Sequence, residues 1–270
     1  MPRPFLKWLG KRADKGIESV TTQHIREFRD SLRAGRTART CNHYTKDISS
    51  IFGAAITEGL IPTNPVSPLK SLPLTDSSER HPFSNDEVQQ LVKMAPSDDW
   101  RGVILLGAYT GLRLGDCAGL TWGNVDLNAC TLTVIPKKTQ RKGIEVRIPL
   151  ASPLRDFLED HPIADDPKAP VFPSLSEMPV SGNSGLSVTF GEVMECAGVS
   201  RGKKRQSGMH ERSFHALRHT FTSWLANAGV PPELRQAMTG HLDDGSHKLY
   251  THHDLSSLQS AIGLLPGLTD

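Results

Sequence analysis

The sequence has no segment that would place the protein in a membrane or an oxidising compartment. No run approaches the roughly 18 consecutive apolar residues of a spanning helix. The start, residues 1–5, lacks the apolar stretch of a signal peptide. No C-x-x-C pair occurs, which argues against a zinc knuckle, a redox motif or a disulfide framework. The four cysteines lie far apart, at Cys41, Cys117, Cys130 and Cys196. We therefore expect a cytoplasmic protein with reduced, mostly buried thiols and no membrane partner.

The motifs of common hydrolases are missing as well. The chain has 11 histidines but no H-E-x-x-H, and the spacing from His210 to His215 does not put two metal ligands on one helix face. The segment 181–185 lacks the G-x-S-x-G order of a nucleophile elbow and is interpreted as a loop. A metal hydrolase is thus disfavoured, and we predict no metal site.

Charge is distributed unevenly along the chain. The net charge is only +2, but residues 1–80 carry 13 Lys and Arg against 8 Asp and Glu. A small basic N-terminal part suits contact with phosphates. The alternative is a solvated, slightly cationic helical surface. The candidate phosphate contacts in this part are Arg26, Arg29, Arg36, Arg39 and Lys46.

The 270 residues are enough for two domains, and the first of them is predicted to be helical. Apolar periodicity predicts one helix from Thr21 to about Gly35 and a second from about Ala38 to Gly59. The polar, proline-bearing stretch that follows is typical of an extended linker. We therefore expect a helical domain over 1–72, a linker over 73–82 and a second domain over 83–270.

The second domain is predicted to be α+β with a small antiparallel sheet, so that the whole chain is a mainly α, two-domain protein. Ser84 to Glu87 form a capping box, and Gly111 ends an apolar helix. Two β-branched segments, 131–136 and 144–149, flank a polar loop and predict a hairpin. Further helices are expected over 153–161, 188–197, 213–229 with Ser213 as a cap, from Pro231, and over 255–264.

Basic residues and a late tyrosine recur in five short motifs. These are Thr110-Gly111-Leu112-Arg113, Lys137-Lys138-Thr139, His215-Ala216-Leu217-Arg218, Gly240-His241 and Tyr250-Thr251-His252. Phosphodiester exchange needs a nucleophile, positive donors around the phosphorus and an acid for the departing 5′ oxygen. Arginine suits the donor role because its planar fork holds two oxygens and stays charged. Each motif alone is usually structural, but together they indicate phosphoryl transfer.

In this order and approximate spacing, the motifs resemble those of the tyrosine recombinases, the phage integrase family. Its members cut and rejoin DNA through a phosphotyrosine. The resemblance is firmest from about Pro82 to Leu258 and looser over the first 75 residues. It implies a core DNA-binding domain followed by a catalytic domain with a C-terminal exchange tail. The region before the linker is short for such a domain, which is then either naturally compact or trimmed at its N-terminus.

The resemblance also implies a role for each motif residue. Tyr250 is the expected nucleophile, since Tyr44 and Tyr109, the other two tyrosines, belong to apolar helices. Arg113, Arg218 and His241 would stabilise the transition state, and His215 would position the tyrosine or act as base.

Lys138 is the preferred general acid, with Lys137 and Lys142 as competitors. Asp116 stands where many relatives carry Glu and would orient an arginine, while His219 is interpreted as a packing residue. Further DNA contacts are expected at Lys137, Arg141, Lys203, Lys204 and Arg205.

A recombinase of this family implies definite partners. We expect double-stranded DNA at attachment or recombination sites, a homotetramer on DNA that is weakly associated or monomeric without it, and accessory DNA-bending proteins. The apolar stripe after residue 254 would pack on its own domain or on a neighbour. No cofactor, metal or ATP is expected. The setting would be a mobile genetic element on a bacterial or phage-derived nucleoid. Two alternatives stay open: a catalytically silent DNA-binding protein of the same fold and a type IB topoisomerase-like strand transferase.

Overall fold

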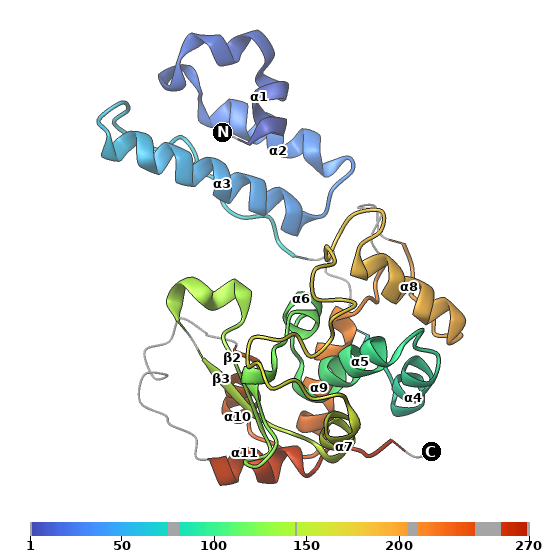
Figure 1. Cartoon of the computed structure of the whole chain (residues 1–270). Coiled ribbons are helices and arrows are strands. Elements are labelled where there is room, and N and C mark those ends of the chain that lie inside the picture. Colours follow the sequence, from blue (N-terminus) through green and yellow to red (C-terminus); the bar gives the residue numbers. More distant parts are fainter. Residues whose placement is uncertain (1, 75–80, 144, 205–209, 241–254, 269–270) are drawn as a thin grey trace. The chain divides into compact units, whose positions relative to one another are not determined.

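The chain divides into two compact units, Met1–Glu79 with Lys204–Met209 and Arg80–Lys203 with His210–Asp270. The first boundary falls inside the segment predicted as a linker. The computed structural model describes residues 2–74, 81–143, 145–204, 210–240 and 255–268 (Figure 1). Within these described ranges, no helix is both long enough and apolar enough to cross a membrane.

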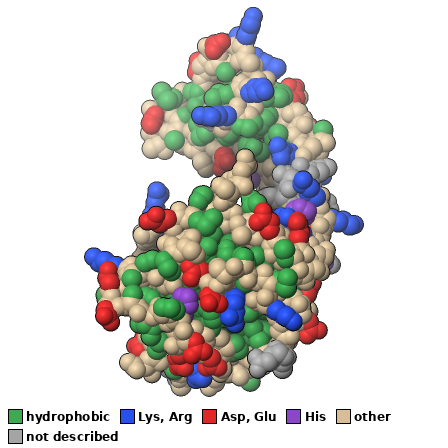
Figure 2. Space-filling view, turned by 45° about the vertical axis from the view of Figure 1, so that its right-hand side comes forward, with side chains coloured by type: hydrophobic (Ala, Val, Ile, Leu, Met, Phe, Trp, Pro, Cys, Tyr) green, Lys and Arg blue, Asp and Glu red, His purple; other side chains and the backbone are tan. Residues whose placement is uncertain are grey.

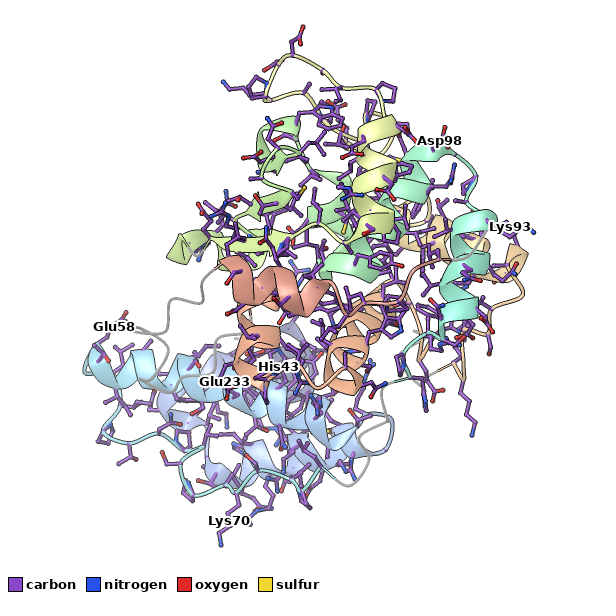
Figure 3. All side chains as sticks on the ribbon, turned by 90° about the horizontal axis from the view of Figure 1, so that it is seen from below. His43, Glu58, Lys70, Lys93, Asp98 and Glu233 are labelled. Carbon is purple, nitrogen blue, oxygen red and sulfur yellow. The ribbon has the colours of Figure 1, made fainter. Side chains whose placement is uncertain are left out.

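The described part of the first unit contains three α-helices around one apolar core. They are α1 (Arg3–Leu9), α2 (Thr22–Arg33) and α3 (Ala38–Thr57). Thr21 caps α2 through a reciprocal pair of bonds with His24, and α3 is the long helix whose C-terminal end is marked by Glu58 in Figure 3. The core consists mainly of Phe5, Ile25, Phe28, Ile48 and Phe52. The two helices expected from periodicity are therefore confirmed, whereas α1 was not predicted.

The second unit is built around the buried helix α5 (Asp98–Thr110), which packs against α4 (Asn85–Lys93), α7 (Ser152–Asp160) and α9 (His215–Asn227). Lys93 and Asp98, labelled in Figure 3, mark the end of α4 and the start of α5. The predicted capping box at the start of α4 is confirmed in both of its halves. The remaining helices are α6 (Leu114–Ala118), α8 (Leu186–Cys196), α10 (Pro232–Thr239) and α11 (Leu255–Ile262).

A three-stranded antiparallel sheet lies beside these helices in the order β1-β2-β3 (Figure 1). The strands are β1 (Val125–Asp126), β2 (Thr131–Val134) and β3 (Val146–Pro149). The predicted hairpin is confirmed, with Leu132 opposite Ile148. Its loop contains a short 3-10 helix over Lys137–Lys142, and α10 and α11 pack against β3.

The prediction that Ser213 caps α9 with its side chain is wrong. The helix begins at His215, and no side chain of the described residues caps its first turn. Instead, the backbone carbonyl of Ser213 accepts a hydrogen bond from the Ala216 N–H at 2.8 Å. The start of α9 must therefore be held in place by other contacts.

The C-terminal segment packs on its own unit. Leu258, Ala261 and Ile262 of α11 are buried in the main core. Tyr109 donates a hydrogen bond from its hydroxyl to the Pro266 carbonyl at 2.8 Å. Of the two arrangements left open for the apolar stripe after residue 254, the structure shows the intramolecular one, while Leu264 remains 57% exposed.

Candidate active site

The first element of the site is a sharp turn at the end of α5. Gly111 has φ of +65° and ψ of 17°, in the left-handed region where glycine is unstrained. A Cβ at this position would lie 2.8 Å from the Phe221 ring, so a side chain does not fit without a shift. The turn leads directly into α6, and Arg113 lies at the N-terminal boundary of that helix with its side chain 30% exposed.

The second element is Arg218 on α9, which is only 2% exposed. Its Nη1 donates a hydrogen bond to the Gly111 carbonyl at 2.7 Å, and its Nη2 donates to the Thr239 carbonyl at the end of α10. The guanidinium thus joins the ends of α5 and α10 to α9. His241, two residues beyond Thr239, lies outside the described residues.

Arg113 and Arg218 are close enough to influence each other electrostatically. The pKa of Arg218 is lowered to about 10, first by burial and then by the charge of Arg113, with Asp116 and Cys117 opposing the shift. A guanidinium with this pKa still carries its charge at neutral pH. Two cations held together before any ligand is present form a site that favours an anion.

The third element is Asp116 of α6, whose side chain is 8% exposed. One carboxylate oxygen lies 4.0 Å from Nη1 of Arg113. The other accepts a hydrogen bond from the backbone N–H of Lys137 at 3.1 Å. The carboxylate therefore lies beside an arginine, as expected, and also fastens the hairpin loop to α6.

Lys137 makes a second contact with the same helix. Its ammonium donates to the Gly115 carbonyl at 3.1 Å, and a Cβ on Gly119 would lie 3.3 Å from it. Lys137 is therefore engaged in holding the loop. The side chains of the other two lysine candidates, Lys138 and Lys142, lie outside the described atoms.

His215 is the exposed first residue of α9, one turn before Arg218. Its ring packs edge-on against the ring of His219, with centroids 4.9 Å apart and planes at 87°. His219 thus supports the neighbouring histidine. Tyr250, the expected nucleophile, lies outside the described residues, so the described part of the site comprises Arg113, Asp116, His215, Arg218 and the anchored loop.

The candidate DNA contacts of the first unit differ in whether their side chains are exposed or bonded within the unit. Arg39 and Lys46 line a cleft of about 740 Å³ along α3, and Arg26 and Arg36 are exposed. Arg29 is only 12% exposed, and its Nη1 donates to the Lys70 carbonyl at 2.9 Å, so its guanidinium holds the segment after α3 in place. The Lys70 side chain itself extends outward (Figure 3). Figure 2 shows Lys and Arg side chains projecting from this unit, in the upper body of the view.

Arg141 and Lys203 in the second unit are exposed, as is Lys204, which is grouped with the first unit, and Arg205 lies outside the described residues. Lys203 also donates its backbone N–H to the Glu211 carboxylate at 3.0 Å. The sequence interpretation missed two features of the second unit: the double anchoring of Lys137 on α6, and an ion pair between Arg212 and Glu87, which lie 125 residues apart. The predicted capping box from Ser84 to Glu87 includes one partner of this ion pair, but it gave no indication of Arg212.

Comparisons with known proteins agree with this fold and identify the family. Residues 82–256 match the model of the Phage integrase family. Tyrosine recombinase XerC of Bacillus pumilus is 26% identical over 267 residues, which cover 94% of this chain and 84% of the relative. Among solved structures, an integrase from mycobacterium phage Brujita has a TM-score of 0.54 at 24% identity, covering 98% of this chain and 83% of that one. A lambda integrase tetramer bound to a Holliday junction has a TM-score of 0.62 at 22% identity, covering 90% and 71%.

The family match and the recombinase relatives, together with the fold, identify a DNA strand-transfer enzyme of the tyrosine recombinase class. The chain belongs to the phage integrase family, whose model matches well over half of its length. It is a site-specific recombinase, an enzyme that breaks and rejoins DNA strands, as the resemblance of its motifs predicted.

Proposed function

We propose that Tyr250 carries the strand transfer through a covalent intermediate. Its phenolic oxygen attacks the scissile phosphorus, the bond from phosphorus to the 5′ oxygen breaks, and a 3′-phosphotyrosyl enzyme and a free 5′ hydroxyl result. The 5′ hydroxyl of one duplex then attacks the phosphotyrosine of the partner duplex. The energy of the phosphodiester bond is retained in the protein linkage, so the exchange proceeds without ATP or a metal ion.

The pairing of Arg113 with Arg218 is the observation that carries this proposal. The two guanidinium groups come from different elements, and Arg113 contributes to the lowered pKa of Arg218. An arriving phosphate would relieve this repulsion, and the extra negative charge of the pentacoordinate transition state would relieve it further. His241 is the third donor of the proposal, and His215 positions Tyr250 or accepts its proton.

Lys138 is the proposed acid that protonates the departing 5′ oxygen. It directly follows Lys137, whose backbone and side chain both bond to α6. Because α6 begins next to Arg113, this anchoring ties the loop to the phosphate-binding element. A loop anchored at the residue before Lys138 suits a lysine that must meet the leaving group when DNA is bound.

Assembly on DNA is proposed by similarity. The lambda integrase structure described above is a tetramer on a Holliday junction, and we propose that four copies of this chain likewise pair two duplexes. Phosphate contacts would come from Arg26, Arg36, Arg39 and Lys46 on the first domain, residues 1–72, and from Lys137, Arg141, Lys203, Lys204 and Arg205 on the catalytic domain, residues 83–270. The working place would be the nucleoid in the cytoplasm, with accessory DNA-bending proteins.

A strand-exchange assay in EDTA tests the proposed function. Two duplexes of different length, each carrying the repeats that flank the gene, are incubated with the protein, and recombinant lengths are scored on a denaturing gel. Recombinant products support the proposal. Relaxation of supercoiled plasmid without exchanged products would indicate the topoisomerase-like alternative, and a native-gel shift without any covalent adduct would indicate the silent DNA-binding protein.

A further inference from the structure

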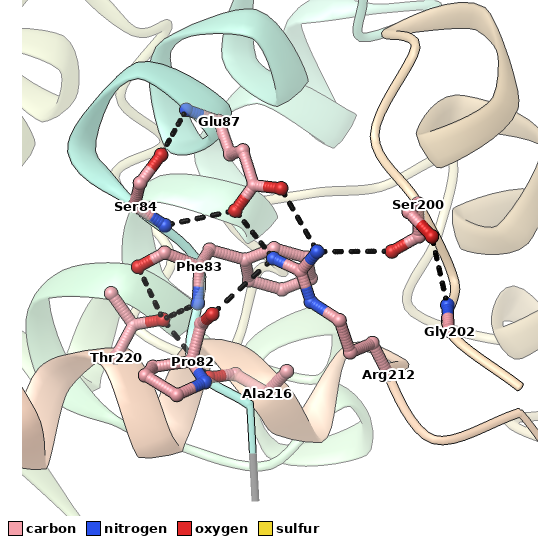
Figure 4. Close-up of polar contacts among 9 residues, drawn as sticks. All are labelled: Pro82, Phe83, Ser84, Glu87, Ser200, Gly202, Arg212, Ala216 and Thr220. Carbon is pink, nitrogen blue, oxygen red and sulfur yellow. Dashed lines mark hydrogen bonds and ion pairs between the residues drawn. The ribbon is translucent and has the colours of Figure 1, made fainter.

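Arg212 forms a partly buried ion pair with Glu87, outside the set of residues described above (Figure 4). Its side chain is 10% exposed, and its two terminal nitrogens bond to the two carboxylate oxygens of Glu87 at 2.9 and 2.5 Å. The same nitrogens donate to the carbonyls of Ser200 at 3.0 Å and Pro82 at 3.3 Å, and the guanidinium lies 4.3 Å from the centre of the Phe83 ring. One side chain thus joins three separate stretches of chain.

Glu87 is held in a fixed orientation by its own helix. Its carboxylate accepts the N–H of Ser84 at 2.9 Å, and its N–H donates to the Ser84 hydroxyl at 3.1 Å. The pKa of Glu87 is lowered, chiefly by the hydrogen bond from Arg212 and against the effect of burial. The carboxylate is therefore charged at neutral pH and offers Arg212 a rigid acceptor at the start of α4.

A second contact links the same stretch of chain to α9. Thr220 accepts a hydrogen bond from the Phe83 N–H at 2.7 Å and donates its hydroxyl proton to the Ala216 carbonyl at 3.0 Å. Arg212 lies three residues before His215, and Thr220 lies two residues after Arg218. The segment that carries both catalytic candidates is therefore fastened at both of its ends to residues 82–87.

Stability alone does not account for the Arg212–Glu87 pair. Burying an ion pair costs about as much solvation free energy as the attraction returns, so an apolar replacement is often neutral. Arg212 also buries its Nε, which has no hydrogen-bond partner among the described residues. A bidentate pair fixes the direction of the side chains that form it. Such a constraint matters at the start of α9, where no side chain of the described residues caps the first turn.

We propose that Arg212 is a positioning residue for strand cleavage, and that its paired bonds to Glu87 fix the direction in which α9 presents His215 to the scissile phosphate. The inference rests on the catalytic role proposed above for His215. Arg212 reaches no reacting atom itself. Its removal lets the first turn of α9 shift, and a displacement of about 1 Å at a catalytic group slows a reaction on the order of a hundredfold.

The test compares Arg212→Met with the double variant Arg212→Met/Glu87→Gln. The single variant leaves the partly buried Glu87 carboxylate without its charged partner and is destabilised. The double variant buries no charge and keeps a side chain at residue 87 that completes the capping box, so its melting temperature returns toward that of the wild type. Arg101→Met, at an exposed pair with Asp98, is the matched control.

The readout is the single-turnover rate of covalent adduct formation on saturating nicked DNA, well below the melting temperature of each variant. We expect both Arg212 variants to cleave about 10- to 100-fold more slowly, with DNA affinity unchanged. In a His215→Ala background, Arg212→Met should cause no further loss, because Arg212 acts through His215.

Two results would overturn the inference. If the double variant regains the wild-type rate together with its stability, the pair is structural only. If Arg212→Met slows the His215→Ala protein as strongly as it slows the wild type, it acts elsewhere. If His215→Ala cleaves DNA at the wild-type rate, the inference loses its basis. The proposed function is scored separately on the same gel, by whether the covalent adduct depends on Tyr250.

Discussion

Replacing Arg218 with lysine keeps the positive charge and removes the planar fork. In the structure, the two terminal nitrogens of Arg218 donate to two backbone carbonyls. One belongs to Gly111, which directly follows α5, and the other to Thr239, the last residue of α10. A lysine ammonium is a single point at the end of a flexible stem, so it satisfies at most one of these directions well. The other carbonyl would then lose its partner.

The magnitude follows from these two bonds. A hydrogen bond to a charged group contributes about 1.5–3 kcal/mol, so the loss of one lowers the free energy of unfolding by about 2 kcal/mol. For a domain of this size, that corresponds to a fall in melting temperature of about 4–8 °C. Removing a transition-state donor slows the chemical step by on the order of 10²–10³-fold. We therefore expect Arg218→Lys to fold, to melt earlier and to cleave at least a hundredfold more slowly.

Differential scanning calorimetry and single-turnover adduct formation on nicked DNA measure the two effects. Arg147→Lys is the matched control, because Arg147 is exposed on β3 and the same chemical change should leave stability and rate unaltered. If Arg218→Lys melts within about 1 °C of the wild type and cleaves within about threefold of its rate, the fork neither joins the helices nor serves the phosphate, and the reasoning fails.

Three further variants test separate parts of the site. Lys137→Met removes the hydrogen bond from the ammonium to the Gly115 carbonyl and should slow cleavage about tenfold at saturating DNA. Replacing the departing 5′ oxygen with sulfur, a better leaving group, should restore the rate of this variant. If the sulfur substrate gives no rescue, Lys137 does not help to present the general acid. Gly111→Ala places a Cβ 2.8 Å from the Phe221 ring on a backbone with φ of +65°. The variant should lower the free energy of unfolding by about 2 kcal/mol. A urea titration measures this change, and a value below about 0.5 kcal/mol would refute the steric argument. Because Arg212 lowers the pKa of Glu87, the pair stabilises the fold above the ordinary glutamate pKa and loses this contribution as pH falls through the lower, folded-state pKa. Wild type should therefore lose more stability than Glu87→Gln between about pH 5 and about pH 3, and parallel curves would argue against the shift.

The sequence predicted those parts of the fold whose signals are local. The capping box at Ser84, the glycine that ends α5 and the hairpin before and after its polar loop each depend on a few adjacent residues, and all three are present. The prediction failed where the local signal misleads. Ser213 is a good capping residue, but the chain enters α9 with Phe214 already in a helical conformation, and α1 is too short to show a clear period.

The order of the motifs predicts a set of candidate site residues, but not how the structure holds them. The bond from Arg218 to the Gly111 carbonyl spans 107 residues and that from Arg212 to Glu87 spans 125, and such contacts depend on the packing of α9 against α5. Lys137 was considered only as an alternative acid or a DNA contact, and its bonds to α6 follow from the position of the whole hairpin. His241 and Tyr250 remain predictions from motif order, since they lie outside the described residues.

The central claim is that Tyr250 becomes covalently joined to DNA without help from a metal ion. The most direct measurement incubates wild type and Tyr250→Phe with nicked duplexes from the repeats that flank the gene, in EDTA, and looks for protein that stays attached to labelled DNA on a denaturing gel. The account predicts an adduct for the wild type and none for Tyr250→Phe, with an equal native-gel shift for both. An adduct that persists in Tyr250→Phe, or a clear shift without any adduct in the wild type, would contradict it.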